Sequence, residues 1–437
     1  MYTGSIPVVA SRSAKALHVT LPLITAAGSS TDLFEHAVLV FGGLLIVGAL
    51  LSGIAHRSFL ALTPVFVLAG LVLGDGGLKV LHFDARSGFV AQLASVALIV
   101  ILFRDGLEVE GELLQRHWAW PARKLVVAMP ITAGIVALAA HALLELDWTR
   151  AFLLGALLSP TDPVLSSSVV TNPRVPRLVR HSLNLESGLN DGLALAPVLA
   201  LGAALATDQH DFVWWRFVLQ DVGLGLAFGV AIGFAASWLL PRGVYAREQM
   251  PAHQRALYAL GIAFATYGAT VLPPHGNGYI AVFVCAIVLG VRRPDIRRDF
   301  ARGSEELVEI AKLGIFVVFG SLLTLGHLFT DGWSAVALVA VTLLLARPVA
   351  VFTALAGLRV DRATKAFMSW FGPKGVATMT FSLLILSQPI AGNERLFDLA
   401  ALVVLCSILA HGLTDTPGTE WFARRSAREA TPPEPSR

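Results

Sequence analysis

The sequence is dominated by apolar segments long enough to cross a lipid bilayer. A helix needs about 20 residues to cross ~30 Å of hydrocarbon. Thirteen segments approach this length, and only 14% of the 437 residues are charged, against about 25% in a soluble domain. We therefore predict an all-α polytopic membrane protein with about 13 transmembrane helices. The candidate spans are 33–55, 59–74, 88–104, 121–145, 149–171, 181–206, 212–240, 255–273, 277–291, 306–327, 332–357, 364–387 and 396–413.

The basic residues support this count and indicate an orientation. Lys and Arg collect in the cytoplasmic loops of membrane proteins. With thirteen spans, most of them fall into alternate loops, including Arg123 and Lys124. We predict a multi-pass protein of the cell membrane, with its N-terminus outside and its C-terminus in the cytoplasm. The opposite side receives only Arg12, Lys15, Lys79, Arg86, Arg150, Arg216 and Arg395.

The two ends and the overall charge carry less information. Residues 1–32 resemble either a signal-like segment or an extension without fixed structure. Residues 418–437 are polar and Pro-rich towards the end, and we expect a disordered cytoplasmic tail. The net charge of +3 does not indicate nucleic acid, since the basic residues are spread among short loops. Cys285 and Cys406 lie in apolar segments, where packing is the expected role.

Two of the predicted spans are interrupted by proline near mid-membrane. One contains Ser159-Pro160-Thr161-Asp162-Pro163, and the other contains Gly372-Pro373-Lys374-Gly375. Proline breaks a helix, and irregular backbone is tolerated at this depth only where protein buries it or where it lines a wet cavity. The two spans run in opposite directions as the middle members of two three-span groups. This pattern predicts inverted repeats with a binding site where the broken helices cross.

Carboxylates enter the membrane in the span 181–206. Asn184, Ser187 and Asp191 are spaced i, i+3 and i+7 and share one helical face, while Glu186 and Asn190 lie beside it. An ionised carboxylate is expensive at this depth, so its presence is a functional signal. Hard cations prefer oxygen ligands. Burial favours the protonated carboxyl whereas a bound cation favours the carboxylate, so the two compete for one site.

Three cations also lie inside predicted spans. Arg347 is near the middle of its span, and its charge complements Glu186, which predicts a structural ion pair between them. Lys374 lies in the second interruption. Lys312 is nearer the cytoplasmic end of its span, and we expect its side chain to snorkel to the membrane surface.

Four motifs lie in the interrupted or charged spans: SPTDPV at 159–164, ESGLND at 186–191, ARPVAVF at 346–352 and WFGPKGV at 370–376. Together they resemble the sodium/proton antiporters, specifically the NhaP/NHE-type branch of the monovalent cation:proton antiporters. The resemblance covers nearly the whole chain. It implies a thirteen-helix protomer, usually a homodimer, with a transporter domain over 33–417. The implied core helices are about 121–206 and 332–413, and the implied dimerisation or scaffold helices are about 33–104 and 212–327.

The resemblance also implies an ion site. Asp191 and Asp162 would bind the cation and the proton, and the Thr161 carbonyl and the Ser187 side chain would add oxygens. Glu186 would act through water or as a structural partner. The implied Na⁺ ligands are therefore Asp191, Asp162, Thr161 and Ser187.

Two further positions bear on the type of exchange. Asn190 stands where the electrogenic branch has a second aspartate, which implies electroneutral one-for-one exchange. Arg347 matches the family's arginine that pairs with the glutamate. Lys374 departs from the usual arginine, and the two cations are not equivalent, so its partner and its part in the pH response stay open.

We predict an antiporter that exchanges Na⁺ or Li⁺ for H⁺ by alternating access and serves pH homeostasis, without a cofactor or enzymatic activity. A K⁺/H⁺ antiporter of the same fold is the alternative. An intramembrane protease and a channel are less favoured. The chain has no Gly-x-Gly-Asp motif in an apolar span and no Gly-x-Ser-Gly motif, and its buried cations suit ion chemistry better.

Overall fold

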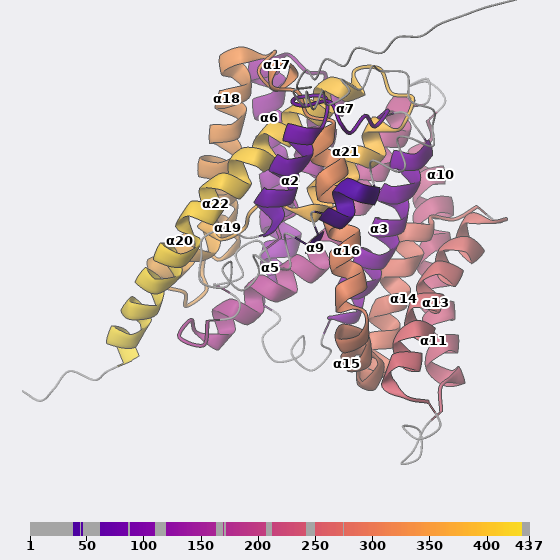
Figure 1. Cartoon of the computed structure of the whole chain (residues 1–437). Helices are drawn as coiled ribbons and strands as arrows, with labels where there is room; N and C mark the ends of the chain where they lie inside the picture. The colour runs from indigo at the N-terminus through magenta and orange to yellow at the C-terminus, as the bar shows by residue number, and fades with distance from the viewer. Residues whose placement is uncertain are drawn as a thin grey trace, which may run out of the picture.

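The predicted spans correspond closely to helices in the computed structural model (Figure 1). The structure describes residues 38–43, 45–46, 62–85, 88–109, 119–162, 169, 172–206, 212–241, 250–273 and 275–430. Every regular element in these ranges is helical, which confirms the all-α class. The segment 1–32 and most of the first predicted span lie outside the described residues.

The first half of the chain leads to the long helix α9. The elements are α2 (Leu62–Leu73), α3 (Gly88–Leu107), α5 (Ala119–Arg123), η1 (Lys124–Ala128), α6 (Met129–Leu144), α7 (Trp148–Leu157) and α9 (Arg177–Ala206), where η marks π-helix. They are followed by α10 (Trp214–Arg216), η3 (Phe217–Gly223), α11 (Leu224–Leu239), α13 (Ala252–Val271) and α14 (Gly278–Arg292).

The second half begins with a short surface helix and ends with the longest helix. The elements are α15 (Pro294–Gly303), α16 (Glu305–Ser321), α17 (Leu325–Leu328), α18 (Gly332–Ala340), η4 (Val341–Ala346), α19 (Arg347–Ala354), α20 (Arg362–Trp370), α21 (Val376–Leu386) and α22 (Asn393–Ala430). Six uninterrupted helical stretches in the described chain are long and apolar enough to cross a membrane: Gly88–Leu107, Ala119–Leu144, Arg177–Ala206, Trp214–Leu239, Gly332–Ala354 and Asn393–Ser426.

Local sequence explains where several helices begin. Asp147, Asn277 and Asp361 precede α7, α14 and α20, and each side chain accepts a hydrogen bond from a backbone N–H of the first turn. Such caps satisfy donors that have no partner within the helix. The caps set the starting points of helices that approach the middle of the bundle.

Two helices in corresponding places of the chain share an unusual backbone. η1 leads into α6, whose second residue is Pro130, and η4 leads into α19, whose second residue is Pro348. A proline has no N–H to give to the preceding turn, and that turn can widen into a π-helix. The first helix of each three-helix group predicted to be a repeat therefore carries the same widened turn.

The C-terminal helix corrects one expectation. The prediction of a disordered tail from residue 418 is wrong for residues 418–430, because α22 continues to Ala430. Phe422 is buried, and its ring stacks on Phe367 of α20 at 4.0 Å between centroids. This contact, together with the buried Ala423, holds a polar stretch of helix against the bundle.

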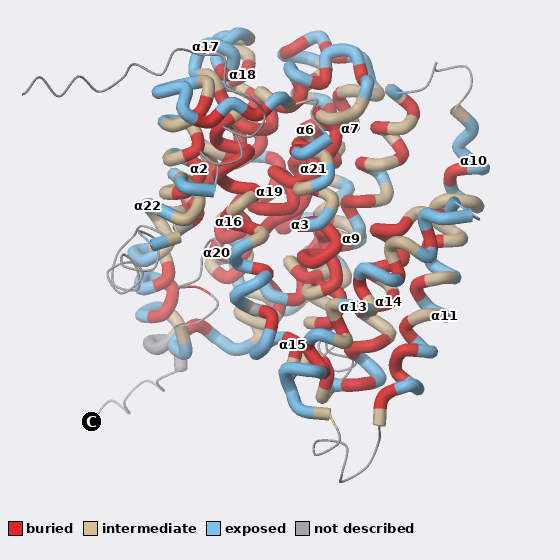
Figure 2. The backbone as a smooth tube through the Cα atoms, turned by 45° about the vertical axis from the view of Figure 1, so that its right-hand side comes forward, coloured by how far each residue is buried: buried red, intermediate tan, exposed pale blue. Residues whose placement is uncertain are grey.

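The bundle has a buried centre and a face of outer helices. The middle of the bundle is mostly buried (Figure 2); α21 is buried along its whole length and α3 over more than half of it, while α11 packs on α14 and α14 packs on α3. α16 lies directly against α2 and also contacts α3 and α21. This position of α16 matters for the site described below.

Glycine allows α2 and α16 to approach closely. A Cβ atom on Gly320 of α16 would lie 2.1 Å from the carbonyl oxygen of Val67, and one on Gly70 of α2 would lie 2.4 Å from that of Val317. Real Cβ atoms do not make such contacts, so both helices must shift if either glycine is replaced. The backbone of α16 is therefore held in place by direct helix-to-helix contact.

We expect Gly320→Ala to destabilise the protein by about 1–3 kcal/mol, the usual range for overpacking. The measurement is the thermal unfolding midpoint of the purified protein in detergent. Gly261→Ala is the matched control, because a Cβ at Gly261 of α13 meets nothing within 4 Å and alanine is the better helix former. Equal midpoints for the two variants would contradict the close approach.

Candidate functional site

The two interrupted spans meet inside the bundle. α7 ends at Leu157, and the chain is non-helical through Asp162; α20 ends at Trp370, and α21 begins at Val376. The backbone N–H of Asp162 donates to the carbonyl oxygen of Pro373 at 2.8 Å. Backbone groups that lose their helical partners at membrane depth need others, and here each interruption supplies one for the other.

Lys374 and Gly375 fit closely around this junction. The Lys374 ammonium is buried and donates to the carbonyl oxygens of Pro160 at 3.2 Å and Ser159 at 3.4 Å. Its own backbone N–H donates to Ser407 Oγ at 2.8 Å. A Cβ on Gly375 would lie 2.3 Å from the Asp162 Cβ, so only glycine permits this approach. Lys374 thus binds the backbone of the first interruption.

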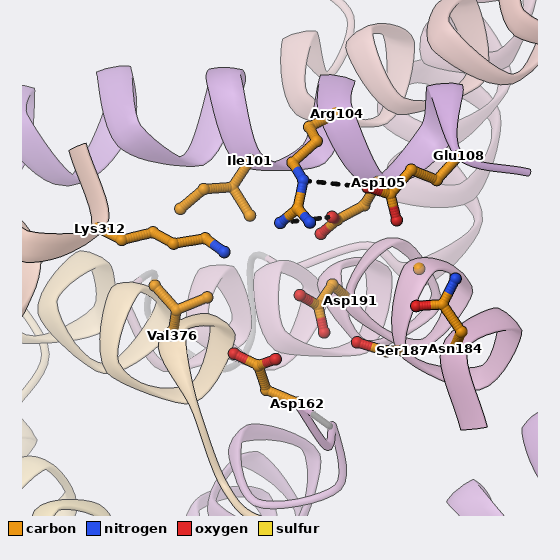
Figure 3. A pocket seen from close by; sticks show the side chains of 11 residues that line it. Ile101, Arg104, Asp105, Glu108, Asp162, Asn184, Ser187, Asp191, Lys312 and Val376 are labelled. Atoms are coloured by element: carbon orange, nitrogen blue, oxygen red, sulfur yellow. Dashed lines mark ion pairs between the residues drawn. The ribbon is translucent and has the colours of Figure 1, made fainter. Parts of the chain in front are cut away.

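Three aspartates from different elements surround one small pocket (Figure 3). Asp191 comes from α9, Asp162 from the first interruption, and Asp105 from α3. All three are buried, with 4%, 8% and 8% exposure. Asp191 Oδ1 has no hydrogen-bond partner among the described residues. The residues lining this acidic pocket are Ile101, Arg104, Asp105, Glu108, Asp162, Asn184, Ser187, Gly188, Asp191, Lys312 and Val376.

The predicted polar face of α9 points into the acidic pocket. Asn184, Ser187 and Asp191 all line it, as their spacing indicated. Asp162 joins them from the interruption, so the structure brings together three of the four expected Na⁺ ligands. Their oxygens are of the kind that suits a hard monovalent cation.

Thr161 and Asn190 contact each other. Asn190 Nδ2 donates to the Thr161 carbonyl oxygen at 2.8 Å and to Thr161 Oγ1 at 3.1 Å. Neither residue lines the acidic pocket. The carbonyl proposed as an ion ligand is thus used by Asn190 in this structure, and Asn190 joins α9 to the first interruption.

Glu186 lies in a separate cavity and contacts two cations. Lys124 Nζ is 2.6 Å from Glu186 Oε2, and Arg347 Nη1 is 2.9 Å from Glu186 Oε1. Lys124 also donates to the Ser182 carbonyl at 3.2 Å, and Arg347 donates to the Met368 carbonyl at 3.3 Å. The residues lining this second cavity are Lys124, Leu125, Ala128, Met129, Thr132, Ser159, Glu186, Asn190 and Arg347.

The sequence pattern missed three residues of these two sites. Asp105 follows the last residue assigned to its span, but α3 continues to Leu107 and keeps it inside the protein. Lys124 was assigned to a cytoplasmic loop, yet the helix begins at Ala119 and Lys124 is 1% exposed. The prediction that Lys312 snorkels is wrong, because it is 6% exposed and lines the acidic pocket. A charge at the end of an apolar run was the available signal for all three.

The comparison with known families now decides the class of protein. The model for the transmembrane sodium/hydrogen exchanger matches residues 44–421, which is most of the chain. The chain belongs to the sodium/hydrogen exchanger family. It is a multi-pass membrane antiporter of monovalent cations and protons, and it is not an enzyme.

The exchanger has relatives with different named cations. It is 25% identical over 400 residues to the K⁺/H⁺ antiporter NhaP of Alkalimonas amylolytica, covering 90% of this chain and 68% of that protein. It is 28% identical over 397 residues to the Na⁺/H⁺ antiporter NhaG of Bacillus atrophaeus, covering 85% and 72%. The fold matches the sodium proton antiporter MjNhaP1 of Methanocaldococcus jannaschii with a TM-score of 0.74 at 20% identity, covering 91% and 99%.

The contacts of Glu186 predict that removing its charge lowers the stability of the protein more than removing the charge of Lys124. Glu186→Gln leaves two buried cations without their carboxylate and should cost about 3–5 kcal/mol of stability. Lys124→Met leaves the contact with Arg347 and should cost less. Unfolding midpoints in detergent measure both.

Arg424→Met serves as the control for these variants. It removes an exposed pair with Glu420 on α22, which should contribute no more than about 0.5 kcal/mol. A midpoint for Glu186→Gln equal to that of Arg424→Met would contradict a stabilising role for the buried cluster.

Proposed function

We propose that the exchanger moves Na⁺ or Li⁺ against protons, and that Asp191 carries either the cation or the proton. The observation behind this assignment is the buried Asp191 carboxylate, whose Oδ1 has no hydrogen-bond partner among the described residues and which faces Asp162 across the acidic pocket. Ser187 supplies a hydroxyl at the same place. The Thr161 carbonyl would join this site when the ion is bound.

Competition at Asp191 explains obligatory exchange. A buried carboxylate needs a proton or a cation to compensate its charge. The loaded forms then cross the membrane barrier more easily than the empty, ionised form. Alternating exposure of Asp191 to the two sides would couple the two fluxes without a separate gate for each ion.

Neutral Asn190 supports one-for-one, electroneutral exchange. It sits next to Asp191 in sequence, and its amide is committed to Thr161. It therefore adds no titratable charge to the site. K⁺/H⁺ exchange is the second candidate, because the chain is similar over 90% of its length to a protein named as a K⁺/H⁺ antiporter.

The acidic pocket lies between two groups of helices, which we propose as core and scaffold. Asp162 and Asp191 belong to the core helices, about 121–206 and 332–413. Lys312 belongs to the scaffold helices, about 33–104 and 212–327, and Asp105 lies on α3, one residue past the first scaffold range. Movement of one group against the other would open the pocket to either side. The homodimer, the cell-membrane location, the outside N-terminus and the role in pH homeostasis belong to the same proposal.

The first test follows internal pH in proteoliposomes while Na⁺, Li⁺ and K⁺ are offered in turn. We expect Asp191→Asn to abolish exchange, because an amide does not take up a proton and has no negative charge to compensate that of a bound cation. Glu309→Gln, which removes an exposed carboxylate from α16, should leave the rate unchanged. Exchange at the wild-type rate in Asp191→Asn would remove this residue from the mechanism.

The second test follows the competition itself. Because the ligand must be deprotonated to bind the cation, the cation concentration for half-maximal exchange should rise as pH falls, approaching about tenfold per pH unit for pure competition. The measurement is a cation titration of wild-type proteoliposomes at several pH values. A half-saturating concentration that does not change with pH would show that proton and cation use separate groups.

A further inference from the structure

Lys312 is a buried cation placed beside the proposed ion site. It lies near the middle of α16, and its side chain is 6% exposed. Figure 3 shows its ammonium directed into the acidic pocket, whose wall also includes Asp105, Asp162 and Asp191. Lysine is almost never fully buried unless it is paired, so its presence at this position indicates a function.

The other cation of the pocket wall is already engaged. Arg104 Nε is 3.1 Å from Glu108 Oε1, and Arg104 Nη1 is 3.9 Å from Asp105 Oδ1. Lys312, in contrast, makes no ion pair within 4.0 Å and no hydrogen bond to any of the described residues. Its charge faces the carboxylates without being bound to one of them.

The position of Lys312 also suits a mobile charge. The α16 backbone is held against α2 by the glycine contacts at Gly70 and Gly320. The lysine stem is flexible, and its ammonium is a compact point charge with three donors. The ammonium can therefore move onto an aspartate or withdraw while the helix stays in place. Asp191 Oδ1, which has no hydrogen-bond partner among the described residues, is an acceptor open to it.

We propose that Lys312 is a tethered competitor of the transported cation. The proposal rests on the ion site proposed above and adds a residue that sets its apparent affinity. Na⁺ and an ammonium group seek the same carboxylate oxygens, so a bound ion forces Lys312 to withdraw. When the site holds neither a proton nor a cation, Lys312 compensates part of the carboxylate charge. Part of the binding free energy of each ion is then spent on displacing the ammonium.

Removing this charge should tighten cation binding. In proteoliposomes at fixed pH, we expect Lys312→Met to lower the Na⁺ concentration for half-maximal exchange by about fivefold to tenfold, the effect of one nearby charge in a partly buried site. Lys312→Arg keeps the charge and should stay near the wild-type value. The maximal rate need not follow the same order, so the two parameters are measured separately.

A matched control and a second measurement make the outcome decisive. Lys365→Met removes a partly exposed lysine from α20, away from the pocket, and should change nothing. Should Lys312→Met reconstitute poorly, Lys312→Gln is titrated with Na⁺ in detergent, where binding raises the unfolding midpoint. An unchanged half-saturating concentration in Lys312→Met would overturn the proposal. A raised concentration would also overturn it, since Lys312 would then support the site.

These results are distinguishable from failure of the proposed function. Absence of exchange in the wild-type protein with Na⁺, Li⁺ and K⁺ would reject the ion site itself. Normal wild-type exchange, lost in Asp191→Asn but with the same half-saturating concentration in Lys312→Met, would reject only the competitor. Repeating the titration with K⁺ shows whether Lys312 affects both cations equally.

Discussion

The interior of this antiporter depends on the pairing of backbone groups freed by its two interrupted helices. The bond from the Asp162 N–H to the Pro373 carbonyl, and those from the Lys374 ammonium to the first interruption, satisfy groups that water cannot reach. Unpaired backbone would be costly at this depth. These contacts fix the positions of Asp162 and Lys374 relative to each other.

The buried charged residues lie in two separate sites. Asp105, Asp162 and Asp191 surround one pocket, while Lys124 and Arg347 contact Glu186 in a second cavity. The separation gives the carboxylates of α9 different surroundings although Glu186 and Asp191 are only five positions apart. Glu186 is compensated by fixed cations of the protein. Asp191 has no such fixed partner among the described residues, which is the condition under which a carboxylate can exchange one mobile cation for another.

Much of this arrangement follows from local rules that a sequence displays. Proline chemistry locates both interruptions, and the helical period places Asn184, Ser187 and Asp191 on one face. Lys124 and Lys312 were misplaced because a cation near the end of an apolar run looks the same whether it reaches the surface or turns inward. Whether the side chain turns inward depends on which helix packs opposite it, and that helix can be distant in the sequence. The helical tail was not predicted for a similar reason, since buried residues such as Phe422, which stacks on Phe367, hold a polar stretch of chain against the bundle.

The contact of Glu186 with two cations has a mechanical consequence. Lys124 begins η1 and Arg347 follows η4, so the two cations come from the first helices of the two groups predicted to be repeats. One carboxylate on α9 is thereby shared by both groups. Separating the two groups would leave buried charges without their partners, so we expect the two groups to move together as one rigid unit. Relative movement of the proposed core and scaffold would then take place at the contacts of this unit with the scaffold helices, among them α3, α14 and α16.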